Sequence, residues 1–242
     1  MLEDYSDMPG HRGVSGEGYG FDQSWIRRMM EAGFQVGIHA IGDAGNRESL
    51  DFVESVYGGA PHARENRNRI EHAQVVHPDD FGRFPELDLI ASMEPPHAGE
   101  DMPWAEDRVG PVRVRGAYAW RTMRETGAPL VFSSDLPGSD WSIFYGMHAA
   151  ITRRNKAEEP AGGWFREQAM TAEETVRAYS QWAAFAAFAE DETGVIEVGR
   201  WADLTVMTID PFVLELEDPG AILDGEIVAT VVNGNVVYRQ GG

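Results

Sequence analysis

Three residues of the sequence have the side chains and the positions to bind a metal ion. His39 and His72 each lie at or near the end of a short apolar run with β-strand character, and Asp135 directly follows a third such run. Histidine nitrogens and a carboxylate oxygen are common ligands of catalytic zinc, and three of them leave one coordination position open. The sequence therefore predicts a site for a divalent metal, with zinc as the expected ion.

The spacing of these residues indicates how a fold could bring them together. His39 and His72 are 33 residues apart, and His72 and Asp135 are 63 apart. A (β/α)₈ barrel of about 250 residues allots roughly 31 residues to each strand-helix unit. The spacings match one unit and then two. All three side chains would then lie at the carboxyl ends of barrel strands, where the active sites of such barrels are built.

The elements that must position these side chains are alternating strands and helices. Strands are predicted at residues 34–39, 69–75, 87–93 and 130–134, and helices at 21–33, 43–57, 117–126 and 142–154. A short helix begins at Pro78, residues 94–113 are predicted as a long loop, and a last helix starts at Thr171 with Glu174 as its capping-box partner. A closed barrel needs eight strands. The four found here indicate an α/β chain that is half a barrel, or another fold.

The pattern changes from Gly194 onward. Short β runs at residues 195–196, 204–207 and 227–232 are separated by glycine and proline, and Asn233-Gly234 is a strong hairpin signal. We therefore predict two domains, a barrel portion at residues 1–190 and a small β-sandwich segment at residues 191–242.

The composition limits the function classes. With 43% hydrophobic residues the chain can bury a core, and with no cysteine it has neither disulfides nor thiolate metal sites. A net charge of −20 argues against nucleic acid and anionic membranes as partners, and it also fits a salt-loving host. No apolar stretch is long enough to span a membrane, so we expect a cytoplasmic protein with a small-molecule substrate.

Four motifs resemble the amidohydrolase superfamily. They are His39-Ala-Ile-Gly-Asp43, Arg69-Ile-Glu-His-Ala-Gln74, Ala91-Ser-Met-Glu-Pro95 and Ser133-Ser-Asp135, and the stretch at residues 194–204 resembles the return of such chains into their β-sandwich. The order of the motifs is most similar to the amidohydrolase family 3 group, the YtcJ-like metal-dependent hydrolases. Glu94 stands where that group usually has glutamine.

The resemblance implies roles for particular residues. In that family, strands five and six each supply a histidine to a divalent metal and strand eight supplies an aspartate, which here would be His39, His72 and Asp135. The His-x-His pair of strand one has no counterpart, and the only lysine, Lys156, lies after strand eight. The resemblance thus implies a partial TIM barrel, strands five to eight, with a small C-terminal β-sandwich portion.

The implied chemistry is metal-assisted hydrolysis of a non-peptide C–N bond in an amide or cyclic amide. Asp135 would take the proton of the attacking water and pass it to the leaving nitrogen. His97 follows Pro95-Pro96 after the third strand. It would face the substrate, or it is an ordinary loop histidine.

A second interpretation remains open, in which the chain is a catalytically inactive truncated fragment or an assembly subunit. A separate amino-terminal chain would then have to supply the missing strands and the His-x-His pair. A half barrel also leaves two strand edges unpaired, at the strand of Gly37 and at the strand of Asp135, and open edges favour pairing with another chain. The expected partners are therefore a second copy of this chain or a complementing amino-terminal chain.

Overall fold

The structure is a computed structural model that describes residues 1–15 and 22–241. The chain divides into two compact units. Unit 1 comprises Met1–Met93 and Asp101–Leu130, and unit 2 comprises Glu94–Glu100 and Val131–Gly242. The domain boundary near residue 190 that the sequence suggests stays a prediction.

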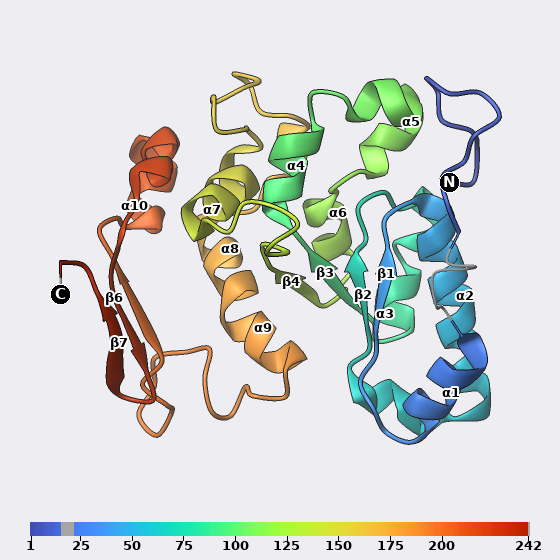
Figure 1. The fold of residues 1–242 in the computed structure, drawn as a ribbon, viewed down its shortest axis with the longest axis horizontal. Helices are drawn as coiled ribbons and strands as arrows, with labels where there is room; N and C mark the ends of the chain where they lie inside the picture. The colour runs from blue at the N-terminus through green and yellow to red at the C-terminus, as the bar shows by residue number, and fades with distance from the viewer. Residues whose placement is uncertain (16–21, 242) are drawn as a thin grey trace. The chain divides into compact units, whose positions relative to one another are not determined.

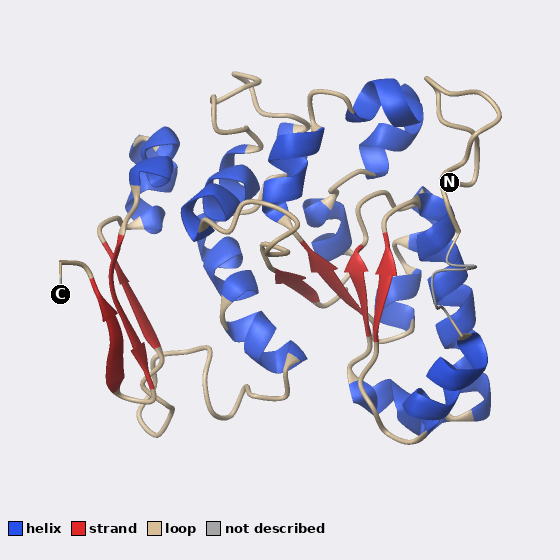
Figure 2. Cartoon of the chain, in the orientation of Figure 1, coloured by secondary structure: helices blue, strands red, loops and turns tan. Residues whose placement is uncertain are grey.

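Unit 1 is built from short parallel strands and the helices that connect them (Figures 1 and 2). Its helices are α1 (Gln23–Glu31), α2 (Asp43–Gly59), α3 (Arg83–Glu86), α5 (Ala105–Arg113) and α6 (Trp120–Glu125). Its strands are β1 (Gly37–Ala40), β2 (Arg69–His72), β3 (Ile90–Met93) and the start of β4 (Leu130–Phe132). The short 3₁₀ helices are η1 (Pro61–Asn66), η2 (Pro78–Asp80) and η3 (Val114–Gly116).

The four strands form one sheet in the order β1-β2-β3-β4, so β1 and β4 are its edges. The pairs β1–β2 and β2–β3 are parallel, with Ile38 opposite Ile70 and Ile70 opposite Ala91. This confirms the α/β class and the four predicted strands. Each strand is shorter than predicted. His39 and His72 lie within the last two residues of β1 and β2, and Asp135 comes three residues after the end of β4.

Helix α2 packs along β1 and supplies much of the core of unit 1 (Figure 1). Leu50, Val53 and Val56 are completely buried on it, at the spacing expected for one helix face. Asp22 caps the start of helix α1, because one of its side-chain oxygens accepts hydrogen bonds from the Ser24 and Trp25 amides.

The prediction of a long loop at residues 94–113 is wrong, because two helices form there. Helix α4 (Pro95–Asp101) starts with two prolines, which the first turn of a helix tolerates because its N–H groups need no partner there. Helix α5 carries Gly110 at φ 78° followed by Pro111, which break its regular backbone. Because glycine and proline interrupt both segments, the sequence does not show a regular helical pattern there.

Unit 2 contains the start of α4, the end of β4, four further helices and a second sheet. The helices are α7 (Ile143–Thr152), α8 (Ala172–Tyr179), α9 (Gln181–Ala186) and α10 (Pro211–Glu217), with 3₁₀ helices η4 (Arg166–Gln168) and η5 (Pro219–Asp224). The predicted helix from Thr171 is interrupted at Ser180, whose φ of −128° and ψ of −82° separate α8 from α9. Phe144, Met147 and Ile151 of α7 form the center of the core with Ala172 and Ile222.

The second sheet consists of β5 (Leu204–Met207), β6 (Ile227–Val232) and β7 (Asn235–Arg239) in that order, all antiparallel. Asn233 and Gly234 both have positive φ and join β6 to β7, as the hairpin signal predicts. The run at residues 195–196 is not a strand. Ile196 is 91% exposed and has no ladder partner in the described part of the chain.

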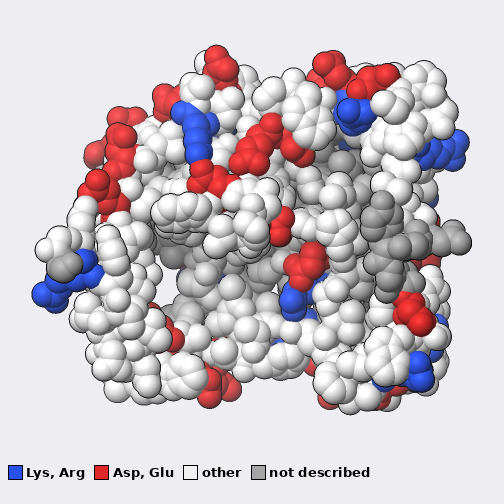
Figure 3. Space-filling view, viewed as in Figure 1, with Lys and Arg blue, Asp and Glu red and all other residues white. Residues whose placement is uncertain are grey.

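Acidic side chains are spread over the face of the molecule drawn in Figure 3, with few basic ones between them. This agrees with the net charge of −20. Within the described residues, no helix combines the length and the apolar character needed to cross a membrane.

Candidate metal centre

His39 and His72 come together at the carboxyl ends of β1 and β2 in unit 1. Their ring centroids are 4.5 Å apart, with the planes at 75° to each other. The register pairs His39 with Glu71 and Ala40 with His72. Regular alternation along the strands would therefore turn the two rings to opposite faces of the sheet. They meet because His72 ends its strand with φ at 76°, which redirects the chain.

Asp135, the third predicted ligand, also has a left-handed backbone, with φ at 55°. Residues other than glycine rarely adopt this region, and they keep it only where the surrounding structure compensates for the strain. Such strain gathers at functional sites. It occurs at two of the three residues that the sequence selected as ligands.

In unit 2, Asp135 lies beside His97. Nε2 of His97 is 3.5 Å from Oδ2 of Asp135, and Nδ1 of His97 is 3.8 Å from Oε2 of Glu94. Glu94 is buried, and its Oε1 accepts a hydrogen bond of 3.2 Å from the Ser133 hydroxyl. His97 therefore lies on α4 between two carboxylates. Whether it contacts substrate stays a prediction.

Glu94 and Ser133 belong to this group of side chains in unit 2, although neither was predicted as a site residue from the sequence. Both belong to motifs that carried the family resemblance, and Glu94 is the position at which the chain departs from the family pattern. That departure was the signal that could have identified Glu94 as a site residue.

Tyr179 of α8 adds a phenol near Glu94. Burial raises the pKa of Tyr179, and the charge of Glu94 raises it further. The hydroxyl therefore stays protonated at neutral pH. Its ring packs against Phe132 at the end of β4, with centroids 5.6 Å apart. Unit 2 thus places a buried O–H group near Glu94.

Each unit holds donor atoms of the kind that bind a divalent transition metal. In unit 1 these are two imidazoles, of which His72 is buried and His39 is exposed. In unit 2 the carboxylate of Asp135 lies beside the imidazole of His97. Imidazole and carboxylate ligands together fit zinc and similar borderline ions better than magnesium or calcium. Because the chain has no cysteine, thiolate ligation is excluded.

The neighbouring Glu71 is not a ligand candidate. It forms an ion pair with Arg69 on the same strand, as expected for a residue that alternates with His72.

Comparison with known proteins agrees with these features. The family model described as the amidohydrolase family matches residues 1–238. The chain belongs to the amidohydrolase family. This confirms the resemblance that the four motifs indicated.

Proteins similar to this chain come from different organisms. The protein YtcJ of Bacillus subtilis is 29% identical over 240 residues, which is 99% of this chain and 44% of YtcJ. LONG AFTER FAR-RED 3 of Arabidopsis thaliana is 29% identical over 98% of this chain and 40% of its own length. The N-substituted formamide deformylase of Arthrobacter pascens is 26% identical over 89% of this chain and 38% of its own length. The chain spans less than half of each of these relatives.

Solved structures show the same relationship. An uncharacterized metal-dependent hydrolase from Pyrococcus horikoshii OT3 matches with a TM-score of 0.72 and 28% identity, over 88% of this chain and 42% of that one. A second one, from Pyrococcus furiosus, matches with a TM-score of 0.69 and 28% identity, over 87% and 41% of the two chains. Two proteins that share the fold of this chain are thus described as metal-dependent hydrolases.

Proposed function

We propose that this chain carries part of the active site of a metal-dependent hydrolase that cleaves a non-peptide C–N bond in a small amide or cyclic amide. The main support is the contact between the His39 and His72 rings at the ends of two neighbouring parallel strands. Family membership and a relative named N-substituted formamide deformylase agree with this reaction class.

The proposed metal ligands are His39, His72 and Asp135, with zinc as the ion. When bound, such an ion lowers the pKa of water from about 15.7 to about 7 and polarises a scissile carbonyl. Asp135 takes the proton of the attacking water on a carboxylate oxygen and returns it to the leaving nitrogen. His97, at 3.5 Å from Asp135, orients that carboxylate and borders the substrate.

In fold terms, we propose that β1 to β4 are strands five to eight of a (β/α)₈ barrel. Residues 191–242, with the antiparallel sheet β5-β6-β7, would be the β-sandwich portion. Strands one to four, with their His-x-His pair, would come from a further segment or a separate amino-terminal chain. The alternative is that this chain is catalytically inactive. A cytoplasmic location stays a prediction.

Zinc binding by the purified chain tests the ligand assignment independently of turnover. We expect one zinc ion per chain by competition with a chromophoric chelator. The affinity should be at least tenfold weaker in Asp135→Asn and His72→Ala, because loss even of a residue that only orients a ligand typically costs about 10- to 100-fold in affinity. His62→Ala is the matched control. His62 is exposed, and its side-chain hydrogen-bond partner among the described residues is the Glu31 carbonyl.

Loss of zinc affinity in Asp135→Asn would not be explained by misfolding. The Asp135 side chain is 44% exposed, so its replacement by asparagine should leave the fold intact. Equal zinc affinity in the unchanged chain and both ligand variants would refute the assignment. Zinc binding without hydrolysis of any N-substituted formamide or cyclic amide, even with an amino-terminal segment supplied, would favour the inactive alternative.

A further inference from the structure

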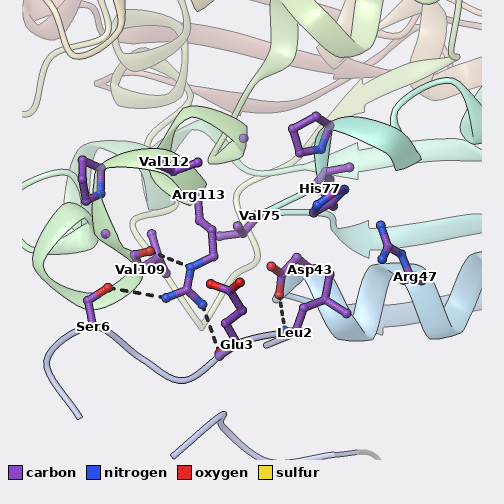
Figure 4. Close-up of a pocket in the computed structure, with 15 residues that line it drawn as sticks. Leu2, Glu3, Ser6, Asp43, Arg47, Val75, His77, Val109, Val112 and Arg113 are labelled. Carbon is purple, nitrogen blue, oxygen red and sulfur yellow. Dashed lines mark hydrogen bonds between the residues drawn. The ribbon is translucent and has the colours of Figure 1, made fainter. Parts of the chain in front are cut away.

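Unit 1 contains a pocket that the proposed hydrolysis does not use. Its volume is about 720 Å³, within the range of small-molecule sites. Four segments line it, namely the amino-terminal stretch, the start of α2, the residues after β2, and α5 with η3 (Figure 4). Pockets of this size that combine apolar walls with a few fixed polar groups are typical of ligand sites.

Arg113 provides the positive charge of the pocket. Its guanidinium donates to the carbonyls of Val109, Glu3 and Asp4 and to the Ser6 hydroxyl. All four acceptors are neutral. The pKa of Asp4 is lowered mainly by its hydrogen bond with Arg12 and to a lesser degree by the nearby charge of Arg113, but Arg113 forms no direct ion pair among the described residues. Its hydrogen bonds hold the guanidinium in place, and a carboxylate on a ligand would pair with it directly.

Two carboxylates supply negative charge on the same pocket. Asp43 is only 1% exposed, and its Oδ1 accepts from the amides of Leu2 and Ala44. Glu3 is exposed and has no ion-pair partner among the described residues. In Figure 4 the side chains of Arg113, Glu3 and Asp43 lie around one opening, although they come from three different segments. The pocket thus presents both signs of charge at fixed positions.

The remaining wall is aliphatic. Val75, Val109 and Val112 line it together with Leu2 and Pro111. Arg47 lies at another side, but its Nε is already bonded to Asp80 at 2.9 Å. His77 lies there too, and its Nδ1 accepts from the Asp79 amide. With these two side chains already bonded, the pocket presents one cation without a direct ion pair, Arg113, and two carboxylates.

We propose that this pocket binds a small zwitterion with an aliphatic body, an aliphatic α-amino acid or a dipeptide. Its carboxylate meets Arg113, its ammonium group meets Glu3 and Asp43, and its side chain packs on the valines. The two carboxylates would repel a ligand that carries only negative charge. Arg113 would repel a ligand that carries only positive charge. Charge complementarity therefore favours a ligand that carries both.

Calorimetric titration of the whole chain with L-leucine and L-leucyl-L-leucine tests the proposal. We expect saturable binding of at least one of them, with a Kd on the order of 1 mM or below. Isoamylamine lacks the carboxylate and 4-methylpentanoate lacks the ammonium group. Each should bind at least fivefold more weakly. Saturable binding of neither zwitterion, or equal binding of all four compounds, would overturn the proposal.

Two substitutions locate the binding. Val112 is 79% exposed at the rim, so Val112→Trp should fill the opening and abolish binding without unfolding the chain. Glu3→Gln should weaken binding about three- to fivefold, as expected for one exposed charge pair. Val198→Trp, at a fully exposed position of unit 2, is the control for an added tryptophan. Unchanged binding in Val112→Trp would place the ligand elsewhere and refute the site.

Discussion

His148 shows how a single side chain can make the stability of unit 2 depend on pH. It is completely buried on α7, and its Nδ1 lies 3.2 Å from the Pro219 carbonyl. That contact requires the proton on Nδ1, so Nε2 would be the site of a second proton. Nε2 is buried and has no hydrogen-bond partner among the described residues. A charged imidazole would therefore be poorly accommodated.

Burial lowers the pKa of His148 below its ordinary value of 6.5, against smaller opposing effects of the Pro219 and Asn155 backbone. Below pH 6.5 the His148 imidazole binds a proton in the unfolded chain, whereas in the folded chain it stays neutral until the pH is lower. Stability is therefore fully present above pH 6.5 and falls as the pH drops toward the folded pKa. We expect urea midpoints to fall between pH 7.5 and pH 5.5, about the span over which histidine titrates.

The His148→Gln variant should lose most of this pH dependence, whatever its stability at neutral pH. His62→Gln, at an exposed position, should retain it. If the midpoint of His148→Gln falls with acid as steeply as that of the unchanged chain, another group is responsible.

At the scale of elements, the start of α8 is an example of local sequence deciding local structure. The Thr171 hydroxyl accepts from the Glu174 amide at 3.1 Å, and Oε2 of Glu174 accepts from the Thr171 amide at 3.0 Å. The capping box predicted from two residue types is therefore present. It satisfies two amides that would otherwise have no partner within the helix.

Thr171→Ala should lower the free energy of unfolding by about 1 kcal/mol, the usual cost of losing a side-chain cap. Glu173→Gln is a suitable comparison, because Glu173 forms an exposed i,i+4 pair with Arg177 and should cost less than about 0.5 kcal/mol. Chemical denaturation of both variants measures the difference. Equal losses would contradict a specific capping role.

The strand ends are the other element-scale feature. The sequence predicts which strands carry His39, His72 and Asp135, since polar residues after apolar runs mark where strands stop. It does not predict which face each side chain takes. For His72 the outcome depends on one backbone angle, at φ 76°, which pattern reading cannot supply.

At the scale of the whole molecule, the first sheet has two edges with no neighbouring strand among the residues that the structure describes. β1 and β4 each have one neighbour in the four-stranded order. Unpaired edges expose backbone groups that can pair with another chain. We expect the isolated chain to form dimers or larger species in multi-angle light scattering, with the fraction increasing with protein concentration. A monodisperse monomer at every concentration would contradict this expectation.

The charge of the whole chain gives a separate prediction. At a net charge of −20, like-charge repulsion opposes the compact state and added salt screens it. The Debye length falls from about 30 Å at 0.01 M salt to about 8 Å at 0.15 M. The thermal unfolding midpoint should therefore rise over this range. Sucrose at matched osmolality controls for general solute effects, and a midpoint that does not change with salt would exclude the charge effect.

The sequence by itself determined the α/β class, the four strands, the capping box at Thr171, and the residues most suited to bind a metal. These depend on periodicity and on neighbours a few residues away, which a linear pattern records. Only the tertiary structure decided that the His39 and His72 rings share one face, that residues 95–113 are largely helical, and that Arg113 faces a pocket. These features depend on single backbone angles and on contacts between distant segments, such as Arg113 with Glu3, and a linear pattern contains neither.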